Sequence, residues 1–109
     1  MVWKVYFFQT ERKDCPVKEF IKEQDETTYS KILRSILLLR NNGPYLKPPY
    51  IKKFQDKLYE LRIAGKTAIR IFYTIRPDGY YLLHAFKKKS EKTPSKELKT
   101  ALDRMKEIV

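Results

Sequence analysis

The run from Leu58 to Pro94 constrains the fold of this 109-residue chain more than any other feature of its sequence. Along it, apolar and polar side chains alternate with a period of two, which is typical of β-strands that bury one face. The turn sequence RPDG at 76–79 interrupts the alternation, because proline presets φ and glycine allows a positive φ. The pattern therefore predicts three consecutive antiparallel strands, at residues 58–63, 67–75 and 80–87.

The residues before these strands predict a further strand and two helices. Residues 2–8 are mostly β-branched and aromatic, which favours a strand. Asp14 is expected to cap a short helix that has Pro16 in its first turn. A second helix is expected to begin near Asp25 or Thr27, and its apolar stripe at helical spacing contains Tyr29, Ile32, Leu33, Ile36 and Leu37.

The second helix is expected to end at the sequence NGP, residues 42–44, because glycine can adopt a left-handed conformation there and proline cannot continue the helix. Residues 45–57 then predict a basic loop, stiffened by prolines, that presents Lys52 and Lys53. After the last strand, the sequence TP at 93–94 predicts the cap and the first position of a final helix.

These elements predict one domain of the α+β class over residues 1–109. The N-terminal strand and a two-helix hairpin pack on a mainly antiparallel sheet of about four strands, and a C-terminal helix follows. In the last strand, the alternation places Tyr81, Leu83 and Ala85 in the apolar layer under the helices. Leu82 is then expected on the other face. That face is expected to be open and to carry polar side chains interleaved with aromatic rings, namely Glu60, Arg62, Arg70, His84, Phe72 and Phe86.

The charge of the chain indicates a polyanionic partner. The formal net charge is +11, and the excess is unevenly distributed. Residues 1–26 carry five Lys or Arg against six Asp or Glu, whereas residues 27–109 carry 19 against seven. A well-solvated basic surface is the alternative explanation. The clustering of cations near strand ends favours a binding face.

Other features narrow the class of protein. The single cysteine, Cys15, cannot form an internal disulfide or a cysteine-based metal cluster. With only one histidine, His84, and few acidic side chains near it, no metal site or cofactor is expected. The apolar run at 36–39 is far too short to cross a membrane, and no signal peptide precedes the first strand. The sequence therefore predicts a soluble cytoplasmic protein with no membrane partner.

The expected polar face carries the groups that metal-free RNA cleavage needs. Arginines donate paired hydrogen bonds to phosphates, and exposed rings such as those expected of Phe72 and Phe86 stack on unpaired bases. Glu60 and His84 supply proton transfer, since a base must deprotonate the 2′-OH and an acid must protonate the leaving 5′-oxygen. Arg70 is the strongest candidate to stabilise the phosphorane, because a mid-strand arginine between isoleucines has no packing purpose.

Each of these residues also has a structural alternative. Glu60 can form an ion pair with Arg62 or Arg70, a role that is compatible with catalysis. His84, among apolar neighbours, can be a hydrogen-bonded structural residue. The lysines at 87–89 can be a solvated strand end, although their position at the mouth of the face favours phosphate binding.

An ordered set of motifs resembles a known superfamily. PYIKKF at 49–54, LYELRI at 58–63, AIRIFY at 68–73 and LLHAFKKKSEKTP at 82–94 span about half of the chain. Together they resemble the RelE/ParE toxin superfamily, and more closely its phage Gp49-like, HigB-type branch.

The resemblance implies the toxin of a type II toxin–antitoxin system, a ribosome-dependent mRNA endonuclease that uses 2′-OH attack without metal or cofactor. The implied partners are mRNA, the ribosome and a cognate antitoxin, often a HigA-like protein with a helix-turn-helix. By position, Arg70 matches the family's phosphate-stabilising arginine, and Glu60 lies where relatives place a catalytic charged residue. Lys88 or Lys89 lies near the position at which relatives have a basic residue after the last strand. Several relatives have a tyrosine near the C-terminus, but none follows Tyr81 here, so the acid and base assignments stay open.

Substrate binding is expected of the surrounding basic and aromatic side chains, namely Arg62, Lys52, Lys53, Lys87, Lys89, Phe72 and Phe86.

Two other functions remain open. A ParE-like DNA gyrase inhibitor shares the superfamily but has no need for the convergence of Glu60, Arg70 and His84. A non-catalytic RNA- or ribosome-binding module would use the same basic face, because affinity and catalysis draw on the same cations.

Overall fold

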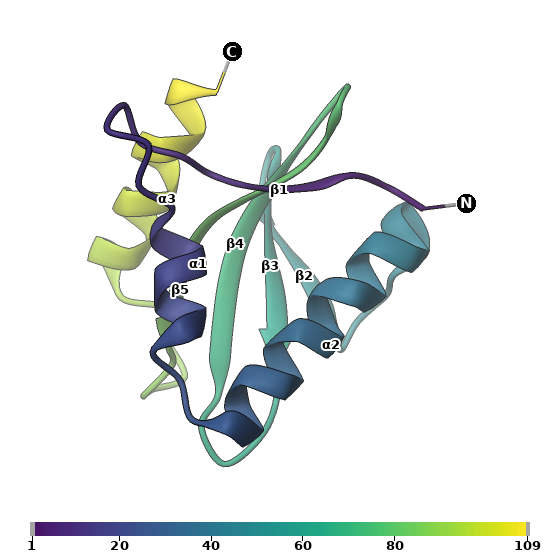
Figure 1. Cartoon of the computed structure of the whole chain (residues 1–109), viewed down its shortest axis with the longest axis vertical. Helices are drawn as coiled ribbons and strands as arrows, with labels where there is room; N and C mark the ends of the chain where they lie inside the picture. The colour runs from purple at the N-terminus through teal and green to yellow at the C-terminus, as the bar shows by residue number, and fades with distance from the viewer. Residues whose placement is uncertain (1, 109) are drawn as a thin grey trace.

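The computed structural model describes residues 2–108 and has the α+β fold predicted from the sequence. Three α-helices cover one five-stranded sheet (Figure 1). In chain order the elements are β1 (Val5–Phe7), α1 (Pro16–Lys22), α2 (Glu26–Asn42), a 3₁₀ turn (Gly43–Tyr45), β2 (Ile51–Gln55), β3 (Leu58–Ile63), β4 (Ile69–Arg76), β5 (Gly79–Lys87) and α3 (Ser95–Glu107).

The sheet has the order β1-β5-β4-β3-β2 and is mainly antiparallel. The strands from β2 to β5 form an antiparallel meander, and β1 pairs with β5 in parallel. The count of five strands exceeds the expected four because Ile51–Gln55, predicted to be part of a loop, pairs with β3 as an edge strand.

The helix boundaries follow local chemistry. Asp25 caps α2, because its carboxylate accepts a hydrogen bond from the backbone N–H of Thr28 at 2.8 Å. The helix ends at Gly43, whose φ is +51° and whose missing side chain leaves room for the Trp3 ring. α1 begins one residue later than expected, with Cys15 at the N-cap position. Asp14 belongs to the preceding turn, where its backbone N–H and carbonyl oxygen are both hydrogen-bonded to Thr10.

The last helix also begins one residue later than expected, because Pro94 occupies the N-cap position and Ser95 is the first helical residue. None of the helices within residues 2–108 has the length and apolar character needed to cross a membrane.

The sheet has a hydrophobic core on each face, which corrects the expectation of one open face. α1 and α2 cover one face, and α3 covers the other (Figure 1). The core beneath α3 contains Phe8, Leu58, Phe72, Leu83, Phe86 and Ala101. The open face was predicted wrongly because the apolar stripe of the C-terminal helix was assigned to the same side as the hairpin.

A β-bulge in β5 reverses part of the predicted alternation. Phe72 pairs with His84 but Tyr73 pairs with Leu82, so Leu83 has no partner in the ladder. Leu82 consequently joins the core under α1 and α2, whereas Leu83 joins the core under α3, which is the reverse of the prediction. Tyr81 also lies against the α3 core, and Ala85 lies where it was expected.

Candidate functional site

A buried glutamate of β3 lies between two arginines, Arg62 near the end of β3 and Arg70 at the start of β4. The Glu60 Oε1 atom is 3.5 Å from Arg62 Nε and 3.7 Å from Arg70 Nε. Arg62 and Arg70 are paired residues of the two strands, and Glu60 is two residues before Arg62, so all three side chains share a face. Glu60 is only 1% exposed, whereas the side chains of Arg70 and Arg62 are 13% and 32% exposed. The ion pair proposed as the structural alternative for Glu60 is therefore present.

This cluster keeps unused hydrogen-bonding capacity. Among residues 2–108, Glu60 Oε2, Arg62 Nε and Arg70 Nε are buried and have no hydrogen-bond partner. Arg70 Nη1 donates to the carbonyl oxygen of Ile69 at 3.0 Å, which helps to fix the guanidinium. Burial lowers the pKa of Arg70, as does the charge of Arg62, while Glu60 opposes the change. An arginine stays protonated despite such effects, so the site holds two fixed cations.

A hollow of about 540 Å³, here called the lysine hollow, opens on one side of the arginine pair. Its lining comprises Arg62, Ala68, Arg70, Lys88, Lys89, Ser90 and Glu91. The end of β5 is held beside β4 because the backbone N–H of Lys88 donates to the carbonyl oxygen of Ala68 at 2.9 Å. The structure therefore brings the predicted Lys88 and Lys89 together with Arg62 and Arg70.

A second hollow, of about 530 Å³ and here called the helix hollow, shares the same two arginines. Its lining comprises Lys31, Arg34, Ser35, Leu38, Pro49, Tyr50, Arg62, Ile63, Ala64 and Arg70. The contributions of α2 and Tyr50 were not predicted from the sequence. The contribution of α2 could have been inferred from the spacing of Lys31, Arg34 and Leu38 in the sequence, which places them on one side of the helix.

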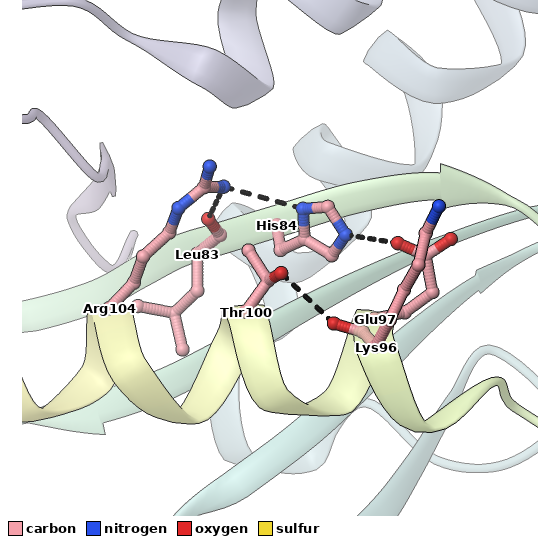
Figure 2. Close-up of polar contacts among 6 residues, drawn as sticks. All are labelled: Leu83, His84, Lys96, Glu97, Thr100 and Arg104. Carbon is pink, nitrogen blue, oxygen red and sulfur yellow. Dashed lines mark hydrogen bonds and ion pairs between the residues drawn. The ribbon is translucent and has the colours of Figure 1, made fainter.

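His84 is engaged by two side chains of α3 (Figure 2). Its Nε2 atom lies 2.7 Å from Glu97 Oε1, and its Nδ1 atom lies 3.3 Å from Arg104 Nη1. Because a guanidinium can only donate, Nδ1 accepts and Nε2 carries the proton that is donated to Glu97. Burial lowers the pKa of His84, although Glu97 opposes this change. The imidazole is therefore neutral and both of its nitrogens have partners.

The cross-strand pairs separate His84 from the arginine cluster. Phe72 pairs with Glu60 on one side and with His84 on the other. Two strand spacings, roughly 10 Å, therefore lie between the Glu60 and His84 backbones. Both expected stacking rings are buried, since Phe72 is 0% and Phe86 is 4% exposed. The expectation that these rings offer an open surface to bases is wrong, because α3 covers them.

The remaining predicted lysines do not form one group. Lys52 pairs with Glu60 and shares its face, whereas Lys53 pairs with Tyr59 on the opposite face. Lys87 pairs with Ile69, also on the face of α1 and α2. None of the three contributes to the lining of either hollow.

A basic α+β domain with a helical hairpin, a β-meander and this arginine-centred site has the RelE-like fold. The chain belongs to the family described as phage derived protein Gp49-like (DUF891), a RelE/HigB-type toxin-like family, which matches residues 19–106. The matched range contains the arginine cluster and both hollows, and membership implies an antitoxin partner. No match was found among curated proteins. Within residues 2–108, no three His, Cys, Asp or Glu side chains gather where they could share a metal ion.

Proposed function

We propose that this protein is the toxin of a type II toxin–antitoxin system and cuts mRNA on the ribosome by metal-free attack of a 2′-OH. The observation that carries the proposal is the arginine pair held by Glu60 where two cationic hollows meet. A pair of guanidinium groups suits a reacting phosphate, and the hollows on either side suit the strand that continues from it.

In the proposed reaction, the 2′-oxygen bonds to phosphorus as the P–O5′ bond breaks, giving a 2′,3′-cyclic phosphate and a 5′-OH end. Arg70 stabilises the charge on the phosphorane oxygens. Glu60 is the candidate base, because its Oε2 has no hydrogen-bond partner in residues 2–108. For substrate to reach the buried Glu60 carboxylate, Arg62, the more exposed arginine, must move aside. Lys88 is the candidate acid for the leaving 5′-oxygen, since it lines the lysine hollow.

His84 takes the site-shaping role in this proposal, because both ring nitrogens are engaged by α3. The partners proposed for the toxin are the ribosome with its mRNA, in the cytoplasm, and a HigA-like antitoxin with a helix-turn-helix. The cationic hollows favour RNA, whose backbone carries one negative charge per nucleotide.

A non-catalytic RNA- or ribosome-binding module is the second candidate. The burial of Glu60 favours it, because a carboxylate that is 1% exposed cannot take a proton from a substrate unless its surroundings move. Both candidates use the same cations for binding, so only the reaction distinguishes them.

The reaction can be tested with purified protein, ribosomes carrying a defined mRNA, and Arg70→Ala as the control. We expect cleavage in the ribosomal A site, 2′,3′-cyclic phosphate ends, and little cleavage of naked RNA. A 2′-O-methyl group at the cleaved nucleotide should stop the reaction, because it removes the nucleophile. Cleavage that survives this block contradicts the mechanism, and binding without cleavage on any ribosome complex supports the second candidate.

A further inference from the structure

The helix hollow has the composition of a nucleotide subsite. We propose, resting on the function proposed above, that it binds the nucleotide next to the reacting phosphate of single-stranded RNA. Lys31 and Arg34 hold the phosphate of that nucleotide, and Tyr50 stacks on its base. Arg62 and Arg70 line both hollows, so an RNA strand with one phosphate at the arginine pair continues directly into this one.

The charges of the helix hollow favour an anion. Its lining contains four cationic side chains, of Lys31, Arg34, Arg62 and Arg70, and no acidic one. In the part of the chain that the structure describes, no ion pair involves Lys31 or Arg34. Lys31 Nζ lies beside the β3–β4 turn, only 2.7 Å from where a Cβ atom on Gly65 would stand. The two α2 cations are therefore placed at the end of the sheet, and in the described part of the chain neither forms an ion pair.

Tyr50 supplies an aromatic surface on a fixed backbone. The residue is 50% exposed, so its ring is not part of either core. Its carbonyl oxygen accepts a hydrogen bond from the backbone N–H of Arg62 at 2.8 Å, and its backbone N–H donates to the carbonyl oxygen of Lys47 at 3.1 Å. An exposed ring on an anchored segment suits base stacking, which tolerates any base. Leu38 and Ile63 add apolar lining, and the volume of about 530 Å³ lies in the range of small-ligand sites.

The subsite can be measured with RNA that cannot react. The probes are 2′-O-methyl RNAs of two and three nucleotides, and their binding is followed by calorimetry at several salt concentrations. We expect the wild-type protein to bind the trinucleotide more tightly than the dinucleotide. Tyr50→Ala should weaken trinucleotide binding roughly 5- to 150-fold, and Lys31→Gln with Arg34→Gln should reduce the salt slope by about 0.7 per charge.

Matched controls separate the site from general surface effects. Tyr45→Ala removes another exposed ring, 73% accessible, that does not line the helix hollow. Lys18→Gln removes an exposed cation of α1 that lines neither hollow. Both variants should bind the trinucleotide as the wild type does. Equal binding of the two probes by the wild type, or unchanged binding by Tyr50→Ala, overturns the inference.

The same variants distinguish this inference from the proposed reaction. If the wild type binds the trinucleotide as expected but cuts no mRNA on ribosomes, the reaction fails and the subsite stands. If the wild type cuts mRNA and Tyr50→Ala cuts at the same rate and at the same positions, the subsite fails and the reaction stands.

Discussion

At the scale of single residues, Glu60 makes stability and the proposed function depend on the same side chains. Its carboxylate is almost completely buried and lies within 4 Å of the Nε atoms of Arg62 and Arg70. A buried charge that loses a partner is costly, because nothing else compensates for the lost hydration. Removing either arginine should therefore affect folding as well as phosphate binding.

Arg70→Ala is expected to lower the cleavage rate by about 10²–10³ and the free energy of unfolding by about 1–3 kcal/mol. Glu60→Gln in the same chain should recover part of the lost stability, since a neutral amide does not need two cations, but none of the activity. Urea unfolding of the two single variants and the double variant gives the coupling free energy, expected at about 0.5–3 kcal/mol. Strictly additive losses of stability would show that the pair is not coupled.

The sequence predicted the arginine cluster because its members are related by short-range rules. The period of two placed Glu60 and Arg62 on one face, and antiparallel pairing brought Arg70 beside them. Their burial was not predictable in this way, because it depends on how the rest of the fold packs. Lys31 and Tyr50 were missed for the same reason, since only the docking of α2 and the path of residues 45–50 bring them to the arginines.

At the scale of elements, polar contacts attach α3 to the sheet along its length. Glu97 contacts His84 near the start of the helix, and Arg104 donates to the Leu83 carbonyl oxygen at 2.9 Å (Figure 2). Arg76 donates to the carbonyl oxygen of Met105 at 3.3 Å. The apolar residues of α3 lie between these contacts and cover the second core. The helix was predicted from its spacing, but the side of the sheet that it covers was not.

The attachment of α3 is expected to weaken as the pH falls. Burial lowers the pKa of His84 below its ordinary 6.5, so the unfolded chain takes up this proton before the folded one does. The contribution to stability is therefore complete above pH 6.5 and is lost as the pH falls through the folded-state pKa. Thermal unfolding of wild type and His84→Gln between pH 5 and 8 tests this. The midpoint of the wild type should fall more steeply below pH 6.5, and parallel curves would contradict the assignment.

At the scale of the whole molecule, the chain separates its charges. In the nearly neutral first 26 residues, α1 and the residues beside it place Asp14, Glu19 and Glu23 in the lining of a hollow that His84 and Arg104 also line. The cations of α2, β3, β4 and the end of β5 gather instead at the two hollows around Arg62 and Arg70. Under the proposed function, such a distribution both attracts RNA from a distance and holds it locally, and these two effects respond differently to substitutions.

Two pairs of lysines separate local contacts from overall charge. Lys88→Gln with Lys89→Gln alters the lysine hollow, whereas Lys53→Gln with Lys87→Gln alters the opposite face, and both pairs lower the net charge by two. The first pair should weaken single-stranded RNA binding and reduce the slope of log affinity against log salt by about 1.4. The slope falls because RNA binding releases fewer counterions when two phosphate contacts are lost. The second pair should leave the slope close to that of the wild type. Anisotropy titrations with a labelled 2′-O-methyl RNA from 50 to 300 mM salt measure both slopes. Equal reductions in the two variants would mean that RNA responds to total charge, and that the lysine hollow makes no specific phosphate contact.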